Sequence, residues 1–217
     1  MRTAVDAPWW TGPLRHARAH DLAPVALLLA VVAGCEAAFG SLTLSFPLQH
    51  AAHSAGFPMR RELPIAYAAL TAGSLHSRMA DLETAAAAVL ARYEGLQLAA
   101  MYAATVLLVG GVELSVSGPG TAVVLVRALL VWTGLALVSG RVFGPRLAWI
   151  LPVATVFPLT YLGEDGQGRA LWWDWTVRPP SDAAGWTLAA VTTAAGLTAF
   201  RLTPWRLRTL RGRLAAR

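Results

Sequence analysis

The sequence predicts an all-α, polytopic membrane protein with six transmembrane helices and with both the N- and C-termini in the cytoplasm. Hydrophobic residues make up 56% of the 217 residues and charged residues only 14%, and the mean hydropathy is +0.51. A soluble domain of this length needs more charge to cover its surface. The apolar residues also gather in long runs, which is typical of helices that face lipid.

Six apolar runs are candidates for helices of about 20 residues that cross a bilayer. The predicted spans are residues 23–46, 63–79, 96–116, 121–139, 147–162 and 183–200. The second span is short, because its apolar part ends near Leu75. The fifth contains Pro152 and Pro158, which predict a kink. Residues 23–200 therefore form one transmembrane domain.

The segments around the spans differ in character. Residues 1–22 contain Trp and Arg together, which favours an interfacial segment over a partly ordered tail. Residues 47–62 are expected to form a loop, and residues 77–95 an amphipathic helical connection. A tight turn is predicted at residues 117–120, which read Ser-Gly-Pro-Gly.

Basic residues set the predicted orientation. All 18 basic residues are Arg, the net charge is +6, and the tail at 201–217 has six Arg and no acidic side chain. Since Arg-rich ends stay in the cytoplasm, this basic tail is expected there, in a multi-pass protein of the plasma membrane. Arg60 and Arg61 then lie outside, which is the one discordant loop. Most Arg residues sit at span ends, which favours a lipid bilayer over nucleic acid as the partner.

Two charged residues within the third and fourth spans are expected at a similar depth. Glu113 lies near the outer end of one span, and Arg127 lies about two turns into the next. Because a four-residue turn joins these spans, we expect the two side chains to form a salt bridge that fixes the helical hairpin. The alternative is that they line a polar conduit.

Glu36 is the third charged residue inside an apolar run, beyond the middle of the membrane. An acid at this depth faces a helix interface or a water-filled cleft. It is either a structural, hydrogen-bonded acid or a group that handles substrate or protons.

A Trp-rich segment precedes the last span. Trp172, Trp173 and Trp175 suit an aromatic belt at the level of the lipid headgroups. The alternative is a short capping segment over an exit path.

Patterns for catalysis, cofactors and metals are missing. The sequence has no HExxH, GxSxG or CxxC motif, and no phosphate-binding loop with its Lys. The histidines His50, His53 and His76 are too few and too badly spaced for zinc. Cys35 is the only cysteine, so an intrachain disulfide is impossible. We expect neither an enzyme nor a cofactor bound by this chain.

One segment, LPIAYAALTAGSLHSRMADLETAAAAVLARYEGL at residues 63–96, resembles the region around the coupling helix of certain actinobacterial membrane proteins. These are the permease subunits of ATP-binding-cassette (ABC) exporters of the second export type. The chain is similar to them over nearly its whole length in layout. An interfacial segment precedes span one, a helical connection follows span two, and a polar, Trp-rich loop precedes span six.

The resemblance implies a permease subunit that forms the substrate pathway together with a second, identical or related, permease subunit. A separate ATPase subunit would bind ATP and Mg²⁺ and dock on the 77–95 helix. The polar residues implied at that contact are Arg78, Asp81, Glu83, Arg92 and Glu94. Two alternatives are a non-transport assembly or anchoring subunit, whose basic tail binds anionic lipid, and a membrane enzyme of unrecognised type that uses Glu36 or the outer loop.

Overall fold

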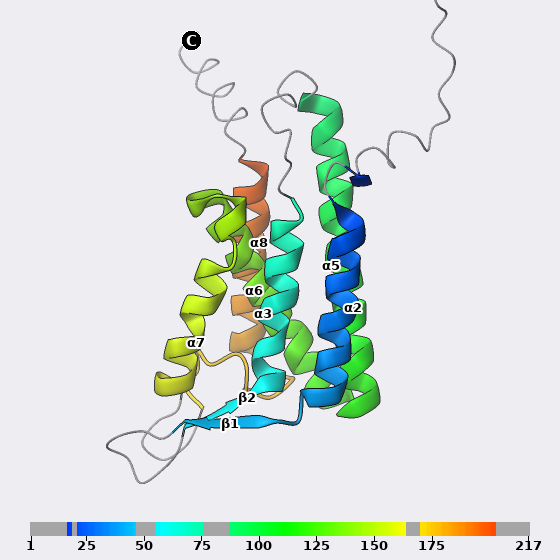
Figure 1. The fold of residues 1–217 in the computed structure, drawn as a ribbon. Helices are drawn as coiled ribbons and strands as arrows, with labels where there is room; N and C mark the ends of the chain where they lie inside the picture. Colours follow the sequence, from blue (N-terminus) through cyan, green and yellow to red (C-terminus); the bar gives the residue numbers. More distant parts are fainter. Residues whose placement is uncertain (1–16, 19–20, 47–54, 76–86, 164–169, 203–217) are drawn as a thin grey trace, which may run out of the picture.

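A computed structural model of the chain describes residues 17–18, 21–46, 55–75, 87–163 and 170–202. These residues form a bundle of six helices that run alternately up and down, with a small β-hairpin at one end (Figure 1). The helices of the bundle are α2 (Leu22–Phe39), α3 (Met59–Gly73), α5 (Ala87–Val116), α6 (Pro119–Phe143), α7 (Ile150–Leu162) and α8 (Ala183–Arg201).

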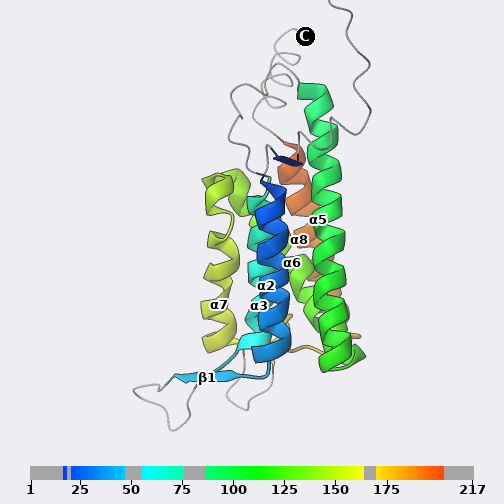
Figure 2. The ribbon, with the colours of Figure 1, turned by 45° about the vertical axis from the view of Figure 1, so that its right-hand side comes forward.

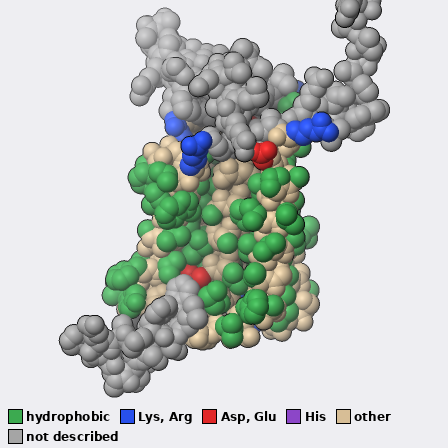
Figure 3. All heavy atoms as spheres, viewed as in Figure 1, with side chains coloured by type: hydrophobic (Ala, Val, Ile, Leu, Met, Phe, Trp, Pro, Cys, Tyr) green, Lys and Arg blue, Asp and Glu red, His purple; other side chains and the backbone are tan. Residues whose placement is uncertain are grey.

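Five stretches are long and apolar enough to cross a membrane, which confirms the prediction of a polytopic all-α membrane protein. They are Leu22–Phe39, Arg92–Val116, Pro119–Phe143, Pro145–Leu162 and Ala183–Arg201. The fourth joins the short 3-10 helix η2 (Pro145–Leu147) to α7. Hydrophobic side chains cover the side of the bundle seen in Figure 3. Such a surface matches lipid tails rather than water.

Helix α3 differs from the second span that the sequence predicts at 63–79. It begins earlier, at Met59, and ends at Gly73. Its 15 residues extend about 22 Å at 1.5 Å per residue, short of the roughly 30 Å of a hydrocarbon core. Because α3 packs against α2, α5, α6 and α7, protein rather than lipid surrounds most of it, and an entirely apolar surface is not required.

Both ends of the bundle's chain lie at the same end of the bundle, as an even number of passes requires (Figures 1 and 2). We call the end with Leu22 and Arg201 the terminal end. The opposite end, which holds the strands β1 (Thr43–Phe46) and β2 (Ala55–Pro58), is the hairpin end. Most of the predicted interfacial segment at 1–22 and of the tail at 201–217 lies outside the described residues.

The β-hairpin replaces part of the loop that the sequence predicts at 47–62. Strands β1 and β2 pair antiparallel, with Thr43 opposite Pro58. The chain then turns directly into α3, and the backbone N–H of Arg60 donates to the carbonyl of Gly40 over 3.2 Å. This connection places Arg60 and Arg61 in the first turn of α3, within the bundle rather than in a loop.

Helix α6 lies at the centre of the core. The side chains of Leu129, Val131 and Trp132 are completely buried, and α6 makes its closest approach to α8. A Cβ atom on Gly134 would collide with the backbone of α8 at Thr192. Small residues at such crossings allow two membrane helices to pack backbone against backbone.

Candidate functional site

The buried charged side chains of the described residues gather in the hairpin half of the bundle. Four of them are completely buried: Glu36, Glu113, Arg127 and Asp174. An ionisable group inside a membrane protein is costly unless it is paired or hydrogen-bonded, so each such group is a candidate for function. The contacts of these four groups define the candidate site.

Glu36 lies on the last turns of α2 and faces α3. The Tyr67 hydroxyl donates a hydrogen bond of 2.6 Å to Glu36 Oε2, and neither residue is exposed. The carboxyl therefore sits at a helix interface, which is one of the two environments that the sequence predicts for it. Its other oxygen, Oε1, accepts no hydrogen bond within the described residues.

Glu113 does not form the predicted salt bridge with Arg127. Its Oε1 atom lies 3.2 Å from Nε of Arg60, an ion pair between α5 and α3. The sequence predicts similar depths for Glu113 and Arg127, but the Arg127 guanidinium bonds to the connection before α8 instead of to α5. Arg60 was missed because the sequence predicts a loop there, although the run Arg-Arg-Glu directly before an apolar stretch also suits a polar first helical turn.

Arg127 is held by three backbone carbonyl groups of residues 170–182, the connection that leads into α8. Its guanidinium donates to the carbonyls of Trp175 at 2.8 Å, Arg178 at 2.6 Å and Pro179 at 2.8 Å. A Cβ atom on Gly185 would lie 3.0 Å from Arg127 Cζ, so the glycine leaves room for the guanidinium. Arg127 thus fastens the connection to the core of the bundle.

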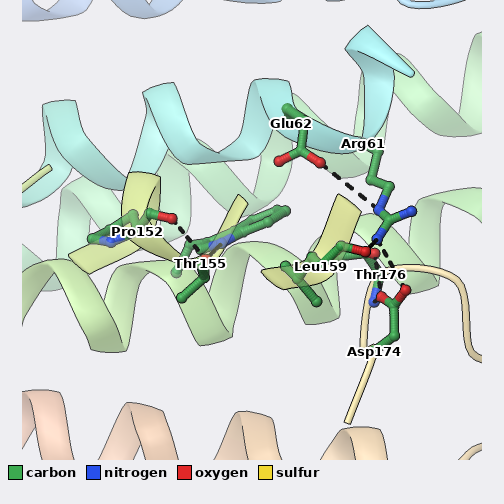
Figure 4. Close-up of polar contacts among 8 residues, drawn as sticks. Arg61, Glu62, Pro152, Thr155, Leu159, Asp174 and Thr176 are labelled. Carbon is green, nitrogen blue, oxygen red and sulfur yellow. Dashed lines mark hydrogen bonds and ion pairs between the residues drawn. The ribbon is translucent and has the colours of Figure 1, made fainter. Parts of the chain in front are cut away.

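Arg61 joins α3 to the same connection, as Figure 4 shows. Its Nη2 atom donates to Asp174 Oδ2 over 2.9 Å and to the carbonyl of Leu159 over 3.3 Å. The other Asp174 oxygen accepts from the backbone N–H and the hydroxyl of Thr176. Glu62 Oε1 lies 3.8 Å from Arg61 Nε. The buried Asp174 carboxylate is therefore fully engaged.

The Trp-rich segment divides into exposed and buried residues. Trp172 is 69% exposed, as a residue of an aromatic belt would be, and Trp173 is partly buried against the core. Trp175 is only 7% exposed and packs edge-on against Trp132, with ring centroids 6.3 Å apart. The belt interpretation therefore fits Trp172, whereas Trp175 anchors the segment in the core.

Arg178 and Asp182 form an ion pair at the start of α8. Nη2 of Arg178 donates to Asp182 Oδ1 over 2.7 Å, and Asp182 Oδ2 caps the helix by accepting from the N–H of Gly185. These two bonds hold the pKa of the Asp182 carboxyl below its usual range, and the bond from Arg178 has the larger effect. The same ion pair raises the pKa of the Arg178 guanidinium.

A cavity of about 460 Å³ opens at the hairpin end beside these contacts. It lies between the first turn of α3, the first turns of α6 and the connection before α8. Its lining residues are Arg60, Arg61, Gly120, Thr121, Val124, Leu125, Thr176, Val177, Arg178, Pro179 and Pro180. Three arginines line it, and no acidic residue of the described chain does.

The other candidate residues lie elsewhere. Arg92 and Glu94, implied as contacts of an ATPase, are in α5 at the terminal end, opposite the buried charges. The remaining implied contacts, Arg78, Asp81 and Glu83, are outside the described residues, as are all three histidines considered for a metal. Within the described part of the chain, no group of three His, Cys, Asp or Glu side chains could hold a metal ion.

Comparison with known proteins adds no relative. No family model, no curated protein and no solved structure matches this chain. The functional argument therefore depends on the fold and on the contacts of the chain itself.

Proposed function

We propose that this chain is the membrane-spanning permease subunit of an ABC exporter of the plasma membrane. In this proposal a separate ATPase subunit binds at the terminal end, and a second permease subunit completes the substrate pathway. The buried polar groups Glu36, Tyr67 and Glu113 support a transport role, because ionisable groups inside a membrane bundle mark pathways for polar substrates and ions.

The observation that carries the proposal is the length of helix α5. Its 30 residues extend roughly 45 Å, well beyond a hydrocarbon core of about 30 Å. The part that is apolar enough to span the membrane begins only at Arg92. Figures 1 and 2 show α5 reaching farther than the other helices at the terminal end. A partner that binds this projection can move a transmembrane helix directly.

The projecting part of α5 has the polar residues that such a contact needs. Arg92 is exposed, and Tyr93 and Glu94 are half-buried. A partner groove binds the apolar face of an amphipathic helix, while polar residues at its rim set the orientation. In the proposal ATP and Mg²⁺ belong to the partner, because a chain without lysine cannot form the phosphate-binding loop of an ATPase.

Co-purification of the tagged full chain from its native membrane tests this proposal. We expect an ATPase with a phosphate-binding loop, identified by mass spectrometry, whose ATP hydrolysis is stimulated by the chain. The variant Arg92→Glu should lose the ATPase. Arg146→Glu is the matched control, because Arg146 is also an exposed arginine at the terminal end but belongs to η2.

Two results would contradict the proposal. If the wild-type chain retains no such ATPase, an assembly or anchoring subunit becomes the better explanation. A reporter fused after Arg217 that is active only outside the cell would place the terminal end on the wrong side for an ATPase.

A further inference from the structure

The cavity at the hairpin end is lined by cations with donors to spare. Arg60, Arg61 and Arg178 line it, with side chains 24%, 14% and 30% exposed. Each guanidinium has five N–H donors in a planar fork that matches phosphate and carboxylate groups. The lining of the cavity therefore presents guanidinium groups, while the acids that pair with them lie outside the lining.

The acidic partners of these arginines occupy only part of each fork. Glu113 contacts Arg60 through Nε, and Asp174 accepts a hydrogen bond from Nη2 of Arg61. Asp182, at the start of α8, accepts one from Nη2 of Arg178. Within the described residues, the Nε atoms of Arg61 and Arg178 have no hydrogen-bond acceptor. None of the acids lines the cavity. The acids hold the forks in place from outside the lining.

The first turn of α6 adds backbone donors to the same cavity. Gly120 and Thr121 line it as the second and third residues of a 25-residue helix. Backbone N–H groups at these positions have no partner inside their own helix. Gly118, the residue before the helix, has no side chain that could cap these N–H groups. The positive end of the helix dipole thus favours an anion here.

Neighbouring tryptophans indicate the depth of the cavity. Trp172 and Trp186 are exposed at the hairpin end, by 69% and 38%. The indole N–H of Trp186 donates to the carbonyl of Pro180, a lining residue, over 2.8 Å. Exposed tryptophans in membrane proteins lie at the level of the headgroups. An anion of the lipid headgroup layer would therefore meet the cavity directly.

We propose that this cavity binds a phosphate group, carried either by an anionic lipid headgroup or by a soluble phosphate ester. The observation that carries the proposal is the convergence of three arginines and the first turn of α6 on one cavity without an acidic lining residue. It does not depend on the transport proposal, because neither the ATPase nor a second permease subunit contributes to the site.

Two probes distinguish the two sources of the phosphate. Glycerol 1-phosphate is titrated onto the full chain in phosphatidylcholine nanodiscs, with thermal unfolding as the readout, because a ligand that binds only the folded state raises the midpoint. Separately, native mass spectrometry counts the lipids retained from nanodiscs that contain phosphatidylglycerol. Binding of the first probe supports a soluble ester, and selective retention of the second supports a lipid headgroup.

A pair of valine variants tests the location. Val177 lines the cavity and is 44% exposed, whereas Val116 is 50% exposed at the same end and does not line it. Val177→Glu should weaken binding roughly tenfold or more, since one added carboxylate repels the ligand. Val116→Glu should bind as the wild type does. If Val177→Glu does not fold, Arg178→Gln should give the same weakening.

The proposal is overturned if neither probe binds the wild-type chain. It is overturned equally if Val177→Glu and Val116→Glu bind with the same affinity, or if Arg178→Gln binds as the wild type does.

Discussion

Replacing Arg127 with leucine should destabilise the protein by about 4 kcal/mol. The side chain is completely buried, and three carbonyls accept hydrogen bonds from it. The bond to Trp175 is buried, and its loss should cost about 2 kcal/mol, within the range for an unsatisfied acceptor. The bonds to Arg178 and Pro179 are partly buried, so water can replace them in part, at about 1 kcal/mol each.

Thermal unfolding in detergent, followed by tryptophan fluorescence, measures this loss. Trp132 and Trp175 pack together beside the guanidinium, so their emission reports on the connection that Arg127 holds. A change of about 4 kcal/mol corresponds to a midpoint lower by roughly 10 °C in a chain of this size. Arg127→Lys should recover only part of the loss, because an ammonium lacks the planar fork.

A double-mutant cycle with Gly185 tests the geometry. Gly185→Ala places a methyl group 3.0 Å from the Arg127 guanidinium and should cost about 1–2 kcal/mol by overpacking. That cost should disappear when Arg127 is leucine. Additive effects would refute the packing of the guanidinium against α8. In contrast, Glu113→Gln and Arg127→Leu should be additive within about 0.5 kcal/mol, since the two residues share no partner.

Three further changes test other contacts of the bundle. Gly134→Leu should cost about 3 kcal/mol or more and remove the folded peak in size-exclusion chromatography, because its Cβ meets the backbone of α8, whereas Gly111→Leu has open space and should not. Arg60→Gln and Glu113→Gln should couple by about 1–2 kcal/mol in unfolding measurements, and additive losses would contradict their ion pair. The folded pKa of Asp182 is depressed, so its stabilisation is present above the unfolded pKa of about 3.9 and is lost as pH falls through the folded pKa. Unfolding midpoints measured from pH 5 to 3 should therefore fall more steeply for the wild type than for Asp182→Asn, and parallel curves would contradict this linkage.

Hydropathy was sufficient to predict most of the bundle. Long apolar runs have few alternatives to lipid-facing helices, so five of the predicted spans correspond to helices that can cross a membrane. It failed at α3, which includes Arg60, Arg61 and Glu62 in its first turn. The two arginines pair with Glu113 on α5, with Asp174 in the connection before α8 and with a carbonyl of α7, and such tertiary partners leave no trace in a local hydropathy pattern.

Three of the four buried charged residues of the candidate site could be predicted from the sequence, but Asp174 and the pairings could not. Glu36, Glu113 and Arg127 stand out because charges are rare inside apolar runs, and all three are buried. Depth follows from counting residues along a span. The direction of a side chain around the axis does not, since α5 and α6 are largely apolar on all sides. The partners of Arg127 are also backbone carbonyls, which every residue has, so the sequence contains no mark of them.

The positions of the arginines also bear on the one discordant feature of the predicted orientation. If Arg60 and Arg61 lay in the predicted loop, they would count against a cytoplasmic terminal end, because the positive-inside rule concerns the loops that flank the spans. In the structure both belong to the first turn of a bundle helix and pair with Glu113 and Asp174. Their position is therefore explained by the interior contacts they make. At the terminal end Arg92, Arg146 and Arg201 are exposed instead, and this contrast supports the proposed orientation with the projecting end of α5 in the cytoplasm.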